Sequence, residues 1–499
     1  RSRATPRRTG NNLLAQWPPS RSLGGSRELI ADGGSFRDRA NRVYDDGMII
    51  VRGVNEEALA NWTALQPQEF FKSLIRRGKV VETSLFDRRA PIAGAPWAGY
   101  LVHQRVPFVT YPYEWSFNML KDAALLHLDI LEDAIPAGWT LKDATAYNVQ
   151  FIGSRAVFID VPSFTERPPG EPWAGYRQFC MMFLYPLMFG AYAGIDYLPY
   201  LRGNLEGIEP RTADRVLGAA RRFKKGVFGH VYLHARIDSR YRDRDLDEAT
   251  NVSEDAGKRP PKRKNTYHSE AMLLGMFQGL RRTINKLKVS GERTAWGSYE
   301  TDHSYAEASF EAKKAFVKKV VNERRRKLTW DIGCNTGTFS RIAAENSDYV
   351  LAMDGDIKVI DQLYERQKAA HDERILPIVI NLANVSPAHG WRGAERKSLE
   401  QRGNPELILC LALVHHIVIS ANIPLGEFIT WLRDFDCDVV IESVGLHDDM
   451  TQMLLRNRVN QYAELEDANF ERVIGEKFEI LRSQPLKGGV RKIFHLTPR

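Results

Sequence analysis

A glycine-rich turn follows a short apolar run in the C-terminal half of the sequence. The turn spans Asp331–Gly337 (DIGCNTG) and precedes a segment that we expect to be helical from Phe339. Glycines let the backbone approach a ligand closely, and the first turn of a helix presents N–H groups that lack intrahelical partners. The pattern therefore predicts a binding site for a polar ligand where a strand passes into a helix.

An acidic residue ends the next apolar run. Asp354 follows VLAM, where its carboxylate could accept hydrogen bonds from both ribose hydroxyls, as in nucleotide-binding α/β folds. A glycine turn and an acid on adjacent strands are what an adenosine-containing cofactor requires at the carboxyl edge of a parallel sheet. The two features together predict such a cofactor.

The elements around these residues predict a doubly wound α/β sheet. Apolar, strand-like runs occur at 349–353, 375–380, 407–413 and 439–441, and helical stretches separate them. Strands that alternate with helices are typical of a parallel sheet covered on both faces.

DIGCNTG followed by VLAMD resembles motif I and the ribose-binding acid of class I S-adenosylmethionine-dependent methyltransferases, over about 296–499. The resemblance implies a Rossmann-like doubly wound sheet, S-adenosyl-L-methionine as cofactor, and methyl transfer as the activity. By position it assigns the ribose to Asp354 and the adenine side to Asn381. It assigns the methionine part of the cofactor to Asp331, Gly333, Cys334, Asn335, Thr336 and Gly337. Asn335 replaces the usual middle glycine, which is tolerable because Asn enters left-handed backbone conformations more readily than most residues.

A dinucleotide site is the alternative interpretation of this turn. Such a site would read GxGxxG and leave room for a pyrophosphate, whereas here the first position is Asp331. An acid at that position would repel a pyrophosphate. The turn therefore favours the methyltransferase interpretation over a NAD-type site or an accidental glycine turn.

Candidate catalytic residues follow the fourth and fifth predicted strands. His415 and His416 come after LILCLALV, and Glu442 follows VVI. Methyl transfer to a protic acceptor requires a base that removes a proton, and an imidazole can do so near neutral pH without a large pKa shift. The alternative is that one histidine packs in the core while the other caps a strand end.

The acceptor of the methyl group stays open. The motif [DN]PP[YF], which methyltransferases acting on bases or amides carry after the fourth strand, is absent. GCNTGTFS, LALVHHIVIS and the long N-terminal extension resemble a bacterial subgroup that includes a host-specific nodulation protein. The resemblance implies a glycan, lipid, other small molecule or protein as acceptor. An aromatic group of Trp296, Tyr299, Tyr305 and Phe310 could form a lid over the cofactor or belong to the core.

The N-terminal half carries a weaker pattern. Asp143 is followed five residues later by Asn148, and Asp160 ends the apolar run VFID. These positions resemble the acceptor-orienting Asp and the two metal-binding residues of kinase-like phosphotransferases, which would imply ATP and magnesium with Asn148 and Asp160 as metal ligands. A glycine-rich loop near 30–60 is missing, and Lys79 is the candidate for the strand lysine. A degenerate kinase-like domain, an active phosphotransferase and a coincidence in an unrelated α+β domain all remain open.

Composition and charge suit a protein of two to three domains. The chain has 499 residues and a formal net charge of +8, which leaves RNA binding or an RNA methyltransferase open without favouring either. The arginine-rich tail and the basic clusters 258–264 and 324–327 motivate that alternative, although such runs are more often solvated surface or flexible linker. We predict an arginine-rich disordered tail (1–27), an N-terminal α+β domain (28–235), a charged linker (236–268), a connecting helix (269–295) and the methyltransferase domain (296–499).

The cysteines and the apolar runs favour a cytoplasmic protein. Four cysteines without a CxxC pair indicate neither a zinc site nor a disulfide framework. The uncharged run 179–195 is shorter than a membrane span requires and contains Pro186, so we expect a buried helix there. The tail does not resemble a secretory signal.

Overall fold

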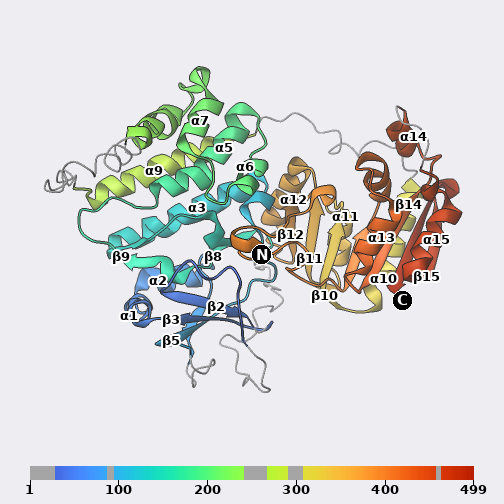
Figure 1. The fold of residues 1–499 in the computed structure, drawn as a ribbon, viewed down its shortest axis with the longest axis horizontal. Helices are drawn as coiled ribbons and strands as arrows, with labels where there is room; N and C mark the ends of the chain where they lie inside the picture. The colour runs from blue at the N-terminus through green and yellow to red at the C-terminus, as the bar shows by residue number, and fades with distance from the viewer. Residues whose placement is uncertain (1–28, 46, 87–94, 241–266, 290–306, 457–461) are drawn as a thin grey trace, which may run out of the picture. The chain divides into compact units, whose positions relative to one another are not determined.

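The computed structural model describes residues 29–45, 47–86, 95–240, 267–289, 307–456 and 462–499 (Figure 1). The predicted tail, most of the predicted linker, and the aromatic residues Trp296, Tyr299 and Tyr305 lie outside the described residues. The chain divides into two compact units. Unit 1 comprises Arg1–Trp62 and Val81–Arg105, and unit 2 comprises Thr63–Val80 and Val106–Arg499.

Unit 1 contains an antiparallel sheet in the order β1-β2-β3-β5-β4. Its strands are β1 (Ile30–Ala31), β2 (Asn41–Asp45), β3 (Ile50–Val54), β4 (Thr83–Leu85) and β5 (Gly99–His103). Val51 of β3 and its cross-strand neighbours Tyr44 of β2 and Val102 of β5 are buried together on one face of this sheet. Helix α1 (Glu56–Leu65) follows β3, and the Asn55 side chain caps it by accepting a hydrogen bond from the Ala58 N–H at 2.8 Å.

The first part of unit 2 is mainly helical. Two antiparallel strand pairs, β6 (Trp139–Leu141) with β9 (Phe164–Glu166) and β7 (Val149–Ile152) with β8 (Arg155–Phe158), follow the long helix α3 (Phe117–Ala134). The other α-helices are α2 (Glu69–Arg76), α4 (Tyr176–Phe179), α5 (Tyr185–Met188), α6 (Leu198–Gly203), α7 (Pro210–Leu217) and α9 (Glu270–Lys286). Antiparallel strands and separate helices make the N-terminal half α+β, as predicted, while its kinase-like identity stays a prediction.

Two local predictions can be compared with this region. The uncharged run forms helical turns from Tyr176 to Ala193 whose residues 179–190 are buried, which confirms a buried helical segment. Among the described helices, none combines the length and apolar composition that a membrane crossing requires. Lys79 is not on a strand: it follows α2, and its ammonium group pairs with Asp129 of α3 at 2.5 Å. The suggestion that Lys79 is a strand lysine is therefore wrong.

The C-terminal part of unit 2 is a seven-stranded sheet in the order β12-β11-β10-β13-β14-β16-β15. Its strands are β10 (Arg326–Ile332), β11 (Ser347–Asp354), β12 (Ile375–Val379), β13 (Leu407–Cys410), β14 (Asp438–Val444), β15 (Phe478–Leu486) and β16 (Arg491–Pro498). The first five are parallel, whereas β16 runs antiparallel to both β14 and β15. Numbered within this sheet, the order is 3-2-1-4-5-7-6, which confirms the predicted Rossmann-like doubly wound sheet.

Helices cover both faces of this sheet, as Figure 1 shows. The α-helices are α10 (Glu307–Glu323), α11 (Thr338–Ala343), α12 (Ile357–Ala370), α13 (Leu425–Arg433), α14 (Asp449–Leu455) and α15 (Asp467–Lys477). Residues of α10, α11 and α12 share one apolar core with the β11 residues Val350 and Ala352. The intervening Leu351 and Met353 are buried on the opposite face. Strands buried on both faces read as continuous apolar runs, which is why the sequence predicts them well.

Candidate functional site

The glycine-rich turn lies at the carboxyl end of β10, where the chain must change direction into α11. Gly333, Asn335 and Gly337 all have positive φ, at 73°, 47° and 83°. The Gly333 and Cys334 N–H groups donate to the Met353 carbonyl at 2.8 and 2.9 Å, which fixes the turn against the end of β11. Asn335 therefore adopts the left-handed conformation that its position in the motif requires.

The turn leaves polar atoms without protein partners. Asn335 Oδ1 and Thr336 Oγ1 are buried, and neither has a hydrogen-bond partner among the described residues. A Cβ added to Gly337 would lie 2.5 Å from Leu363 Cδ1, so only glycine fits there. Buried polar atoms without partners are rare in native proteins because each one costs free energy. These two are suited to meet a polar ligand.

Asp331 is buried where β10 ends. The Ser340 hydroxyl of α11 donates to its carboxylate at 2.5 Å. Burial raises the pKa of Asp331 to about 6, because the ionised form loses hydration. Burial also raises the pKa of the nearby Cys334 thiol, so this cysteine is neutral at pH 7.

Asp354 connects the turn to β11. Its Oδ2 accepts the Asn335 N–H at 3.0 Å and its Oδ1 accepts the Asp356 N–H at 2.9 Å. Burial raises the pKa of this carboxyl group. Each carboxylate oxygen has a further lone pair, so Asp354 can still accept hydrogen bonds from two hydroxyl groups.

Asn381 follows β12 at the same edge of the sheet. The Ile380 N–H donates to the Asp354 carbonyl at 2.8 Å. Gly355, the residue after Asp354, lies close to Asn381, because a Cβ added to this glycine would be 3.8 Å from Asn381 Cα. The Asn381 Oδ1 accepts the Ala383 N–H at 3.0 Å and starts the 3₁₀ turn Leu382–Asn384. All the predicted cofactor residues therefore meet at one edge of the sheet.

The two histidines follow β13 beside the turn. A Cβ added to Gly333 would lie 3.3 Å from Leu413 Cδ1, so the segment that leads to the histidines passes close to the turn. The ring centroids of His415 and His416 are 4.1 Å apart. His415 is fully buried, and neither of its ring nitrogens has a partner among the described residues.

Burial changes the expected acid–base behaviour of these histidines. It lowers the pKa of His415 well below the usual range and that of His416 to about 4. The expectation of little pKa shift is wrong, since sequence alone does not show that both rings are removed from water. Both imidazoles are neutral at pH 7.

Glu442 belongs to a buried ionic network that the sequence did not indicate. Its carboxylate pairs with the Lys313 ammonium group of α10 at 2.5 Å and with the Arg491 guanidinium of β16 at 3.4 Å. Arg491 also binds the two oxygens of Asp448 at 2.7 and 2.9 Å. Lys313 could have been found, because Phe316, Val317 and Val320 follow it at helical spacing and place it on the apolar face.

In the N-terminal half, the three residues of the kinase-like pattern do meet. The Asn148 amide nitrogen donates to Asp143 Oδ1 at 2.9 Å and to Asp160 Oδ2 at 3.4 Å, and Ser163 Oγ donates to Asp143 at 3.0 Å. An amide nitrogen is a donor, whereas magnesium takes oxygen ligands. Within the described part of the chain, no group of three or more His, Cys, Asp or Glu side chains could hold a metal. The geometry shows a hydrogen-bonded cluster, and its role as a metal site stays a prediction.

The basic run 324–327 is occupied by contacts within the chain. Arg324 pairs with Asp438 at 3.0 Å and Arg325 with Asp348 at 2.6 Å. Arg326 is buried and donates to the Val320 carbonyl at 3.0 Å. Arg324 and Arg325 are thus paired at the surface and Arg326 is buried, so this run adds no support for RNA binding. The other basic cluster, 258–264, lies outside the described residues.

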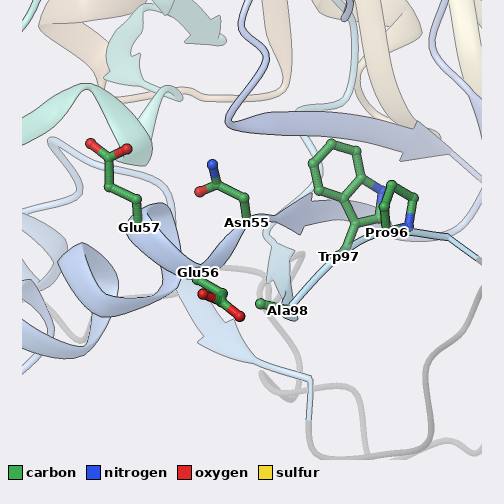
Figure 2. Close-up of a pocket in the computed structure, with 6 residues that line it drawn as sticks. All are labelled: Asn55, Glu56, Glu57, Pro96, Trp97 and Ala98. Atoms are coloured by element: carbon green, nitrogen blue, oxygen red, sulfur yellow. The ribbon is translucent and has the colours of Figure 1, made fainter.

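An open hollow in unit 1 is unrelated to these sites. It is lined by Asn55, Glu56, Glu57 and the segment 96–98 (Figure 2). The Asn55 side chain is already used to cap α1. None of the predicted site residues lines this hollow, and we assign it no function.

Comparison with known protein sequences places the chain in a family. No family model matches the chain. The chain is 30% identical over 467 residues to the nodulation protein NoeA of Rhizobium meliloti (strain 1021), a match that covers 92% of this chain and 94% of that protein. The chain belongs to the NoeA family. The predicted resemblance to a nodulation-related subgroup is therefore confirmed.

Several solved structures that are similar to part of this chain are methyltransferases. The N-methyltransferase NodS from Bradyrhizobium japonicum WM9 is 11% identical, with 38% of this chain and 97% of that chain covered and a TM-score of 0.29. The magnesium protoporphyrin IX methyltransferase ChlM from Synechocystis PCC 6803, with bound S-adenosylmethionine, is 16% identical, with 42% and 86% covered and a TM-score of 0.28.

Proposed function

We propose that the chain is an S-adenosylmethionine-dependent methyltransferase whose acceptor is a small molecule, glycan, lipid or protein. The main support for this proposal is the glycine-rich turn, whose Asn335 N–H donates to Asp354. In the described part of the chain, the turn leaves Asn335 Oδ1 and Thr336 Oγ1 buried without hydrogen-bond partners. These groups fit the polar methionine part of the cofactor. When bound, S-adenosylmethionine would supply an activated methyl group on a sulfonium sulfur.

Each residue has a defined task in this proposal. Asp354 accepts hydrogen bonds from the ribose hydroxyls, and Asn381 contacts the adenine. Asp331 helps to hold the methionine part, and its raised pKa of about 6 shows that burial already disfavours its ionised form. A cationic amino group beside it would favour ionisation and pair with the carboxylate.

Removing the Asp354 carboxylate should weaken cofactor binding. We expect Asp354→Ala to raise the dissociation constant for S-adenosylhomocysteine about 10- to 150-fold, since a charge-assisted hydrogen bond contributes about 1.5–3 kcal/mol. Calorimetric titration measures this constant. The matched control is Asp348→Ala at the opposite end of the same strand, where the carboxylate pairs with Arg325.

The outcome for the wild-type protein decides the proposal. A folded wild-type chain that binds neither S-adenosylmethionine nor S-adenosylhomocysteine would contradict it. Equal binding by wild type and Asp354→Ala would leave the cofactor in place and remove the ribose contact from the proposal.

We place the proton acceptor at His415 or His416, which are neutral at pH 7 and lie beside the turn. His415→Asn and His416→Asn should leave S-adenosylhomocysteine binding within about twofold. The variant that removes the base should slow methyl transfer about 10²- to 10⁴-fold. Transfer from labelled S-adenosylmethionine to an acceptor found by screening measures this effect. If His416 is the base, the rate of methyl transfer should fall as the pH is lowered through about 4. The pKa of His416 is about 4, so the unprotonated form that accepts the proton predominates above that pH.

Unchanged transfer in both variants would exclude the histidines as bases. Glu442 then remains as a candidate, although its ion pairs with Lys313 and Arg491 favour a positioning role.

A further inference from the structure

The adenine side of the proposed site rests on a short turn after β12. Asn381 begins this turn, and the Asn384 N–H donates to the Asn381 carbonyl at 2.9 Å. Asn381 itself is exposed, so its own packing does little to hold its side chain in one position. Contacts from elsewhere must therefore fix the turn if Asn381 is to recognise a base.

Arg202 of α6 supplies such contacts from the N-terminal half of the chain. Its guanidinium donates to the Asn384 carbonyl at 3.0 Å, to Asn384 Oδ1 at 3.0 Å and to the Val385 carbonyl at 2.8 Å. Arg202 lies 182 residues before Asn384 in the sequence. A guanidinium is planar and carries its donors in a fixed fork, so three such bonds define the orientation of the turn as well as its position.

Helix α6 is itself anchored at this edge of the sheet. Leu198, one turn before Arg202, packs against the apolar core that α10, α11 and α12 form with the sheet. The neighbouring Tyr197 is fully buried, and its hydroxyl donates to the Trp115 carbonyl at 3.0 Å. Arg202 therefore extends from a fixed helix and does not merely lie on the surface.

We propose that Arg202 is a positioning residue for adenine recognition, which acts by holding the turn that carries Asn381. This inference rests on the proposed function and goes beyond it, because it makes the N-terminal half part of the cofactor site. The Asn381 Oδ1 is already used within the turn, so the amide NH₂ is the group that donates to a ring nitrogen of adenine. Adenine N1 accepts a hydrogen bond, whereas N1 of hypoxanthine carries a proton and cannot.

The test compares two ligands that differ only in the base. S-adenosylhomocysteine and S-inosylhomocysteine are titrated calorimetrically into wild type, Arg202→Ala and Arg202→Lys. The matched control is Arg221→Ala, since Arg221 also donates to two carbonyls, those of Tyr192 and Leu217, but within the helical region. Circular dichroism verifies that each variant is folded.

We expect the wild type to prefer S-adenosylhomocysteine by about tenfold, the effect of one well-placed hydrogen bond. In Arg202→Ala this preference should fall to about twofold or less, through weaker binding of the adenine ligand alone. Arg202→Lys should be intermediate, because an ammonium group cannot bridge the carbonyls as a fork does. Arg221→Ala should keep the wild-type preference.

Two results would overturn the inference while leaving the proposed function intact. One is that Arg202→Ala keeps the wild-type preference for S-adenosylhomocysteine over S-inosylhomocysteine. The other is that Arg202→Ala loses the same affinity for both ligands, which would indicate a general structural role. A folded wild type that binds neither ligand overturns the proposed function, and this inference with it. If Arg202→Ala does not fold, Arg202→Lys alone decides between these outcomes.

Discussion

Replacing Arg402 by methionine should lower the free energy of unfolding by about 3–5 kcal/mol, because it leaves a buried carboxylate without its cation. Arg402 and Glu114 have fully buried side chains and form two hydrogen bonds, at 2.5 and 2.7 Å. Ser386 Oγ and the Tyr111 N–H also donate to the Glu114 carboxylate, at 2.6 and 3.0 Å. The pair thereby joins the segment before α3 to the loop between β12 and β13.

Urea unfolding followed by circular dichroism measures this loss. The matched control is Arg472→Met, which breaks an exposed pair with Glu476 one helical turn away and should cost about 0.5 kcal/mol or less. The double variant Glu114→Gln with Arg402→Met should recover much of the loss, because it removes both charges together. A loss below about 1 kcal/mol in Arg402→Met would mean that water reaches the carboxylate.

The predictable part of the site is the part encoded by neighbouring residues. Asp331–Gly337 and Asp354 are separated by one helix and lie on adjacent strands, so local pattern was enough to place them together. The left-handed Asn335 follows from the motif in the same way. The parallel strands β11 to β14 could also be predicted, since burial on both faces produces uninterrupted apolar runs. The antiparallel strands β15 and β16 were missed, and most residues of β15 are not buried.

The rest depends on contacts between distant segments. Nothing near Arg202 in the sequence indicates that it meets Asn384, and nothing near Arg491 indicates a bond to Asp448. The acid–base state of His415 was mispredicted for the same reason: its pKa is set by burial, which only the assembled fold creates. Lys79 shows the opposite error, in which a short pattern suggested a strand lysine although the residue lies outside the strands, after α2.

The buried network around Glu442 should be as sensitive as the Glu114–Arg402 pair. Glu442→Gln removes the charge that faces the buried Lys313 ammonium group at 2.5 Å, so we expect a loss of about 3–5 kcal/mol in the free energy of unfolding. Urea unfolding measures it, and Lys492→Gln, which breaks a more exposed pair with Glu471, is the control. Little change in Glu442→Gln would mean that the carboxylate charge contributes little to the stability of the fold.

A second variant separates the structural role of Glu442 from a catalytic one. Lys313→Met with Glu442→Gln removes both members of the pair, so stability should largely return. If Glu442 only stabilises the fold through its ion pairs, this variant should bind S-adenosylhomocysteine and transfer methyl groups at close to the wild-type rate. If Glu442 is the base, the variant should be stable and bind the cofactor but transfer methyl groups about 10²- to 10⁴-fold more slowly. Since the carboxylate is fully buried and paired with two cations, we expect the first result.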